Sequence, residues 1–312
     1  SNMLLYVPVP LLTGYSTSLQ NLGKVNNRGW ELALTSQHTF TNGFGYSFNA
    51  NYAKNTNEVK ELGPGNAPII SSGSVGHAYY ITEVGKPIGN YYLLVQDGIF
   101  ATEEDLKKYP HFDNTEVGDF RFVDVDGDGK LDLDKDRTIC GNYMPKFTYG
   151  FGGKLWYAGF DMDFNFQGVY GNKILNLNKR YLDNMEGNTN GTKIALDRWK
   201  SPENPGSGSV NKANRKQTGY NSRTSTWHLE SGSYLRLQNL SLGYTLPRAL
   251  TQKFKVEKMR VYVSGQNLFT ITNYSGYNPE VNARPSQNLT PGEDYGTYPL
   301  ARTYMFGLNL TL

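Results

Sequence analysis

The chain has 312 residues with 31 basic and 28 acidic side chains, which gives a net charge of +3 at pH 7. That balance is too even to favour nucleic acid or an anionic membrane surface as the partner. Mean hydropathy is −0.56, and no run approaches the eighteen apolar residues of a candidate transmembrane helix. The single cysteine, Cys140, excludes an internal disulfide and provides no zinc-ligand cluster.

Low hydropathy is compatible with a membrane β-barrel, because a barrel strand carries apolar residues only at alternate positions. The first part of the chain, residues 1–54, has this pattern. Residues 3–12 form the tail of one strand, and residues 29–40 and 44–54 alternate apolar and polar side chains on either side of an Asn-Gly turn. This part therefore predicts barrel strands and a first hairpin.

Residues 146–171 predict a longer hairpin. In its second strand Phe160, Met162 and Phe164 alternate with polar residues, which separates an aromatic face from a polar one. Strands of about ten residues suit an oblique crossing of a bilayer. Residues 231–312 add three more strands, at 233–246, 258–268 and the carboxyl end, and the apolar phase of the first of these slips in a way that indicates a bulge.

Long excursions separate these strands, at 55–145, 172–230 and 270–300. The first is expected to contain short strands at 79–84 and 90–100 and a helix capped by Thr102. In the second, apolar residues from Ile174 to Met185 fall at helical spacing, which predicts a short helix. Excursions of this length favour folded functional segments over structureless loops.

Short turns alternate with long loops along the whole chain, as in outer-membrane barrels with periplasmic turns and extracellular loops. The fold class is therefore all-β, a transmembrane antiparallel β-barrel. Apart from the tail at residues 3–12, the pattern gives seven strands, whereas single-chain bacterial barrels have an even number. An unclosed sheet would also expose backbone edges to lipid. We expect the chain to be the carboxyl-terminal part of a larger barrel, whose export signal lies upstream because residues 1–12 do not resemble a signal peptide.

An acidic loop at residues 124–136 (DVDGDGKLDLDKD) has the spacing of an EF-hand loop. Position twelve is Lys135, so the usual bidentate acid is missing or displaced to Asp136. We expect a structural Ca²⁺ ion here, because carboxylates this close repel one another without a cation, although an acidic turn that binds nothing has the same composition. The candidate ligands are Asp124, Asp126, Asp128, the Lys130 carbonyl, Asp132 and Asp136.

No catalytic residues are predicted. Asp161 and Asp163 have the spacing of a paired-carboxylate site, but polar inward residues are expected in any barrel. The sequence contains no Ser-His-Asp order, phosphate-binding loop or metalloprotease motif, so an enzyme is not expected. The aromatic residues of the loops are candidates for a substrate or lid surface, among which the sequence does not choose: Tyr79, Tyr80, Tyr91, Tyr92, Trp199, Trp227, Tyr274 and Tyr277.

Several phrases, spread in order over nearly the whole chain, resemble the SusC/RagA-like TonB-dependent transporters of Bacteroidetes outer membranes. They are residues 20–31 (QNLGKVNNRGWE), 85–100 (GKPIGNYYLLVQDGIF), 118–141 (GDFRFVDVDGDGKLDLDKDRTICG), 160–171, 197–205 (DRWKSPENP), 233–247 (SYLRLQNLSLGYTLP), 260–281 (RVYVSGQNLFTITNYSGYNPEV) and 298–312. The last residue is Leu312, whereas such proteins usually end in an aromatic residue.

The resemblance implies a 22-stranded plugged barrel, with the plug and the TonB-contacting segment upstream. It also implies a SusD-like surface lipoprotein acting as a lid, outer-membrane lipid around the barrel, and import of an oligosaccharide or oligopeptide. Energy would reach the barrel through TonB. The rival interpretation is a secreted, calcium-stabilised, β-rich adhesion or carbohydrate-binding module.

Overall fold

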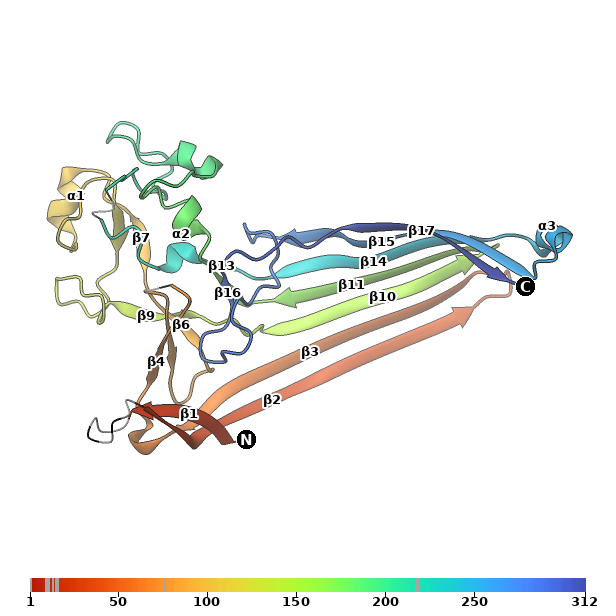
Figure 1. Cartoon of the computed structure of the whole chain (residues 1–312), viewed down its shortest axis with the longest axis horizontal. Helices are drawn as coiled ribbons and strands as arrows, with labels where there is room; N and C mark the ends of the chain where they lie inside the picture. Colours follow the sequence, from red (N-terminus) through yellow and green to blue (C-terminus); the bar gives the residue numbers. More distant parts are fainter. Residues whose placement is uncertain (1, 9–11, 13, 15–16, 76, 217–218) are drawn as a thin grey trace.

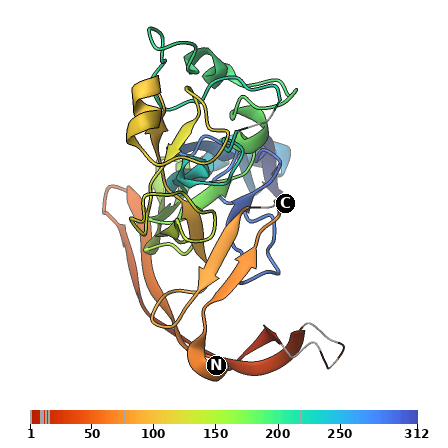
Figure 2. The ribbon, with the colours of Figure 1, turned by 90° about the vertical axis from the view of Figure 1, so that its left-hand side faces the viewer.

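The computed structural model describes residues 2–8, 12, 14, 17–75, 77–216 and 219–312. Within these ranges, eight strands form one large antiparallel sheet in the order β1-β2-β3-β10-β11-β14-β15-β17. These long strands run side by side and carry a lobe of loops at one end (Figure 1), which faces the viewer in Figure 2. The strands are β1 (Asn2–Pro8), β2 (Thr17–Thr39), β3 (Gly45–Leu62), β10 (Phe147–Tyr157), β11 (Phe160–Tyr170), β14 (Tyr234–Thr245), β15 (Lys258–Thr272) and β17 (Thr303–Thr311).

The predicted hairpins are confirmed. Strands β10 and β11 pair from Phe147↔Tyr170 to Tyr157↔Phe160, and only Ala158 and Gly159 connect them. Both connecting residues have positive φ, 48° and 86°, the backbone twist that matches a two-residue hairpin. All three short turns lie at the end opposite the lobe, beside the carboxyl terminus (Figure 1).

The expected bulge in the strand at 233–246 is also confirmed. The register of β14 against β11 shifts between Leu237 and Asn239, where Gln238 is the extra residue. The register against β15 shifts at the same place, but there the extra residue lies on β15, because residues 267 and 268 stand opposite Gln238. On either side of Gln238, apolar residues return to the same face, because one inserted residue restores the period of two.

The strands extend further toward the lobe than the alternation predicts. β2 begins at Thr17 and not near residue 29, and β3 continues to Leu62, so the two pair beyond the apolar part of the hairpin. The strand expected at 3–12 is β1, which ends at Pro8; residues 9–11 lie outside the described residues. The sheet does not close on itself within the described ranges, and β1 and β17 are its edges.

The lobe has its own small sheets, β4-β5-β6-β9, β13-β12-β16 and β7-β8. Tyr80, Tyr91, Leu93 and Leu175 form the fully buried centre of one core, while Phe112, Phe120 and Phe122 belong to a second. Its strands are β4 (Ile69–Ser72), β5 (Tyr79–Thr82), β6 (Asn90–Leu94), β7 (Gln96–Ile99), β8 (Phe120–Phe122), β9 (Arg137–Gly141), β12 (Lys173–Asn176), β13 (Leu229–Ser231) and β16 (Glu293–Asp294).

Helices are short. The expected helix after Thr102 is α1, Glu103–Lys108, and the Thr102 and Asp105 side chains form a capping box. The remaining turns of helix are α2 (Lys179–Leu182), α3 (Arg248–Thr251), η2 (Pro64–Asn66), η3 (Lys193–Asp197), η4 (Thr226–His228) and η5 (Gln252–Phe254). No helix among the described residues is long and apolar enough to cross a membrane.

The helix expected from Ile174 to Met185 is wrong for most of its length. Ile174 lies in strand β12, and helix follows only in α2. Ile174 and Leu177 are fully buried in the lobe, so the apolar spacing serves a buried strand and its continuation. Packing against β13 and β16 overrides a local pattern that fits either structure.

Candidate functional site: a two-faced wall and a loop lobe

The outer face of the large sheet is apolar and exposed along its whole length. Leu32 and Leu34 on β2 are 61% and 58% exposed, and Phe306 on β17 is 87% exposed. The alternate positions of the sequence predict this face. A soluble domain rarely leaves so extended an apolar surface in water, whereas the same surface is stable against lipid.

Aromatic side chains gather at both ends of this face. Toward the lobe, the ring of Tyr52 stacks on Trp30 and on Phe147, with centroids 4.9 Å and 5.1 Å apart. Phe147 in turn stacks on Tyr170 at 4.9 Å. At the turn end, Phe160 packs against Tyr244 with centroids 4.5 Å apart, and Tyr157 and Phe44 lie beside them. These are the two girdles of a membrane barrel.

The spacing of the two girdles fits a bilayer. Phe160 and Tyr170 are the first and last residues of the eleven-residue strand β11, so they are separated by about 33 Å at roughly 3.3 Å per residue. A strand tilted by about 40° then crosses about 25 Å, the height of the apolar band of outer-membrane barrels. The wall is therefore long enough to span the membrane.

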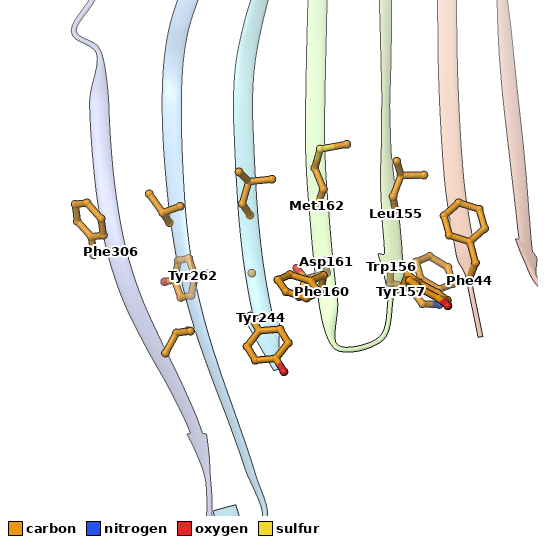
Figure 3. Close-up of a pocket in the computed structure, with 14 residues that line it drawn as sticks. Phe44, Leu155, Trp156, Tyr157, Phe160, Asp161, Met162, Tyr244, Tyr262 and Phe306 are labelled. Carbon is orange, nitrogen blue, oxygen red and sulfur yellow. The ribbon is translucent and has the colours of Figure 1, made fainter. Parts of the chain in front are cut away.

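A shallow apolar hollow marks the turn end of the outer face. Leu155, Met162 and Phe306 line it from three strands (Figure 3). The hydrogen-bonded register puts Leu155, Met162, Leu242, Val263 and Phe306 in one row across the sheet. Because this row belongs to the lipid-facing side, we interpret the hollow as membrane-contacting surface and not as a pocket for a soluble ligand.

The inner face is polar. Asp161 on β11 accepts hydrogen bonds from Nε and Nη2 of Arg260 on β15, at 2.9 Å and 2.6 Å. Such a bidentate ion pair fixes both side chains. Both carboxylate oxygens of Asp161 are engaged by Arg260, so neither is free for acid–base chemistry. Asn165 and Gln167 continue the same face toward the lobe. The inward direction of Asp161 and Asp163 is as the alternation predicts, and their surroundings are those of a barrel interior.

The lobe is held together by buried acids of the third excursion. Glu293 on β16 is fully buried and accepts hydrogen bonds from Ser74 N at 3.0 Å, Ser74 Oγ at 2.5 Å and Tyr80 Oη at 3.1 Å. Burial raises the pKa of Tyr80, and the neighbouring Tyr91 and Glu293 raise it further, so Tyr80 stays protonated as the donor. Glu293 thereby joins segments 219 residues apart.

A second acid ties the same excursion to the wall. Glu280 accepts hydrogen bonds from Tyr234 Oη at 2.5 Å and from Arg236, both on β14. Arg236 is 4% exposed and also donates to Asn278 Oδ1 at 2.8 Å. None of these partners is predictable from the sequence, since each pair is far apart in the chain and neither residue belongs to a local motif.

The acidic loop brings three of its six predicted ligands together. Carboxylate oxygens of Asp124, Asp126 and Asp128 all lie within 4.8 Å of one another. The other two carboxylates shape the loop: Asp136 accepts the N–H groups of Val125 at 2.7 Å and Asp132 at 2.6 Å. Asp132 accepts the N–H groups of residues 134 and 135, which lower its pKa.

Three of the eight loop aromatics considered as a surface are buried. Tyr80 and Tyr91 are fully buried and Tyr274 is 5% exposed, so these three belong to the lobe core and its hydrogen bonds. Tyr277 is 78% exposed and remains a surface candidate. Tyr298, which the sequence did not single out, is 90% exposed; no alternation or motif distinguishes exposed from buried tyrosines in the loops.

His228 is the most deeply buried histidine of the lobe. Burial first, and then the positive charges of Lys179 and Arg180, lower its pKa to about 3. It is therefore neutral at physiological pH, and its Nδ1 accepts the N–H of Ser225 at 3.2 Å. Its role in the lobe is therefore structural.

Comparison with known proteins finds close relatives for almost the whole chain, although no family model matches it. It is 34% identical over 97% of its length to TonB-dependent receptor P3 of Formosa agariphila, of which it covers 30%. It is 26% identical over 97% of its length to TonB-dependent receptor SusC of Bacteroides thetaiotaomicron, of which it covers 28%. A solved structure, the RagAB peptide transporter, aligns with a TM-score of 0.75 and 26% identity over 99% of this chain and 32% of that one.

The two-faced antiparallel wall and these relatives define an outer-membrane β-barrel protein, of which this chain forms a portion. Over nearly its whole length the chain is similar to the SusC/RagA-like TonB-dependent receptors. It spans about a third of the length of the relatives that it matches. The family consists of outer-membrane receptors and transporters and not of enzymes, as the sequence predicts.

Proposed function

We propose that the chain forms part of the wall and the surface loops of a TonB-dependent nutrient importer. The observation that carries the proposal is the wall itself, with an apolar, girdled face for lipid and a polar face for a conduit. The lobe lies at one end, which we assign to the extracellular side, and the short turns are then periplasmic. Energy for import comes from TonB through an upstream segment.

The proposed cargo is an oligosaccharide or an oligopeptide. Support for either comes from the relatives, since one similar structure is titled a peptide transporter and the sequence resembles the SusC class. A SusD-like lipoprotein is the proposed lid over the lobe. The exposed rings of Tyr277 and Tyr298 offer it, or the cargo, amphipathic contact area.

Uptake by the whole receptor tests this function. Cells with and without the receptor gene are given a panel of labelled oligosaccharides and oligopeptides, with and without a protonophore. We expect one class of cargo to enter only with the receptor present, and its entry to stop when the proton gradient collapses. Equal uptake of every compound by both strains would contradict the importer and favour the secreted module.

We also propose a structural Ca²⁺ ion in the acidic loop. Two oxygens that bind one calcium at about 2.4 Å can lie no more than about 4.8 Å apart, and the oxygens of Asp124, Asp126 and Asp128 satisfy this limit. Asp136, one position beyond the usual acid, has both oxygens engaged by backbone N–H groups. It would close the loop around the ion and would complete the site without the bidentate contact of a regular EF-hand.

Calcium is expected to stabilise the lobe in a way that depends on Asp126. After chelation, calcium at about a hundred times its dissociation constant should add about 2.7 kcal/mol to the free energy of local unfolding. Hydrogen exchange of residues 120–141 measures this protection. Asp126→Ala should abolish the gain, whereas Asp113→Ala, which removes an exposed acid outside the loop, should keep it. Equal exchange with calcium and with chelator would rule out the site.

A further inference from the structure

The turn between β14 and β15 differs from the other two turns at its end of the wall. Those two, residues 40–44 and 157–160, carry no charged side chain, whereas residues 246–257 carry Arg248, Lys253 and Lys255 against the single acid Glu257. All three basic side chains are exposed. Within the described part of the chain, no ion pair engages any of them.

The backbone of the turn is anchored at both ends. Thr251 is 1% exposed and Val256 is 8% exposed. Backbone hydrogen bonds hold both ends, from Leu246 N to Met259 O at 2.9 Å and from Glu257 N to Thr311 O at 2.8 Å. Between these anchors the chain forms α3 and η5, which project from the end of the wall beside the carboxyl terminus (Figure 1).

Two large apolar side chains of this turn are nevertheless exposed. Leu250 is 49% exposed and Phe254 is 76% exposed, and their spacing of four residues brings them onto one side of a helical turn. Apolar side chains flanked by Lys and Arg characterise segments that lie at a membrane interface, with rings among the acyl chains and cations at the phosphates.

The neighbouring wall continues the same apolar surface. Tyr244 and Val261, on the strands that enter and leave the turn, line the outer hollow of Figure 3. An acyl chain lying in this hollow would place its headgroup near the turn. The surface is therefore continuous with the lipid-facing wall, and its net positive charge selects the sign of the headgroup.

We propose that the β14–β15 turn is a binding surface for anionic phospholipid in the leaflet at the turn end of the barrel. Arg248, Lys253 and Lys255 bind the phosphate groups, and Leu250 and Phe254 insert beside the acyl chains. The surface fixes the depth of the barrel in that leaflet. It is separate from cargo recognition, so the proposal stands independently of which nutrient is imported.

The test uses the whole receptor in nanodiscs made of equal parts of phosphatidylglycerol and phosphatidylcholine. The receptor is then transferred to detergent, and native mass spectrometry counts the lipids that remain bound. The parent should retain an excess of phosphatidylglycerol. The triple variant Arg248→Gln, Lys253→Gln, Lys255→Gln should reduce this excess by about tenfold or more, since each basic side chain near an anionic surface contributes on the order of a fivefold gain in affinity.

Two controls separate charge at this turn from general effects. Neutralising three exposed lysines of the lobe, Lys107→Gln, Lys108→Gln, Lys200→Gln, should leave the excess unchanged. The charge-preserving variant Arg248→Lys, Lys253→Arg, Lys255→Arg should also retain it, which excludes misfolding of the turn. An unchanged excess in the Gln triple variant, or an equal loss in the lobe variant, would overturn the proposal.

A separate variant tests the apolar contribution. Leu250→Ser with Phe254→Ser should lower the retention of both lipids, because the cations alone hold headgroups only at the surface. Leu196→Ser, at a 74% exposed site in the lobe, is the control. It should change the retention of neither phosphatidylglycerol nor phosphatidylcholine. Full retention after both substitutions in the turn would contradict insertion of these side chains.

Discussion

The Phe164→Lys substitution is expected to prevent most of the receptor from assembling in the outer membrane. Phe164 lies near the middle of β11, on the outer face between the two girdles. A lysine on the lipid face at the bilayer midplane costs roughly 2–4 kcal/mol, and the aromatic contact with Phe166, with centroids 6.2 Å apart, is lost as well. Heat-modifiable migration of the receptor in isolated outer membranes measures assembly.

Asn165→Lys is the matched control, because it introduces the same residue one position along the same strand but on the inner face. It should assemble nearly as well as the parent. Phe306→Lys should show an intermediate loss, since its row lies closer to the turn-end girdle, where the cost of a charge declines. If Phe164→Lys and Asn165→Lys assemble equally, the outer face does not contact lipid.

The Glu293→Ala substitution is expected to loosen the lobe without removing the wall. It leaves Oη of Tyr80 without an acceptor in a site with no exposed surface at Glu293 or Tyr80. The N–H and Oγ of Ser74 lose their acceptor too, but Ser74 is an exposed residue, so water can replace it. An unsatisfied buried group costs about 1–3 kcal/mol, so the free energy of local opening should fall by about 2 kcal/mol. Hydrogen exchange of β4 and β5 should accelerate more than about tenfold.

Glu104→Ala provides the comparison for this experiment, because Glu104 is an exposed acid on α1 in the same lobe. It should leave exchange in β4 and β5 unchanged. The protection of β10 and β11 should also stay the same in both variants, since the lobe lies beyond the end of the wall. Unchanged exchange in Glu293→Ala would show that Glu293 does not hold the excursions together.

The strands of the wall could be predicted because each one is encoded by a pattern of neighbouring residues. An alternation of period two, as in β10 and β11, indicates a strand and identifies its two faces at once, and the phase slip near Leu237 marks the bulge. The family could be identified for a similar reason, because short phrases recur in order along the chain. The extent of β2 and β3 toward the lobe could not be predicted, because the ends of these strands are polar and pair without an apolar alternation.

The interior of the lobe depends on contacts that no local pattern encodes. Ile174 and Leu177 fit a helical stripe, yet β12 pairs with β13 and β16, which lie 54 or more residues away in the chain. From the sequence alone, Tyr80 is a candidate surface aromatic. In the structure it is buried and donates a hydrogen bond to Glu293, which lies 213 residues later in the chain. In the acidic loop the sequence identifies carboxylates of suitable spacing, but only the structure shows that Asp124, Asp126 and Asp128 are the ones that converge.

The most direct test of the proposed importer is the mass and location of the native polypeptide. Outer membranes are solubilised in detergent, the receptor is isolated, and its intact mass and co-purifying proteins are determined. We predict a membrane-embedded polypeptide far heavier than the 35.0 kDa of this chain, with a surface lipoprotein attached. A 35.0 kDa polypeptide in the soluble fraction, with no lipoprotein, would contradict the importer and support a secreted module.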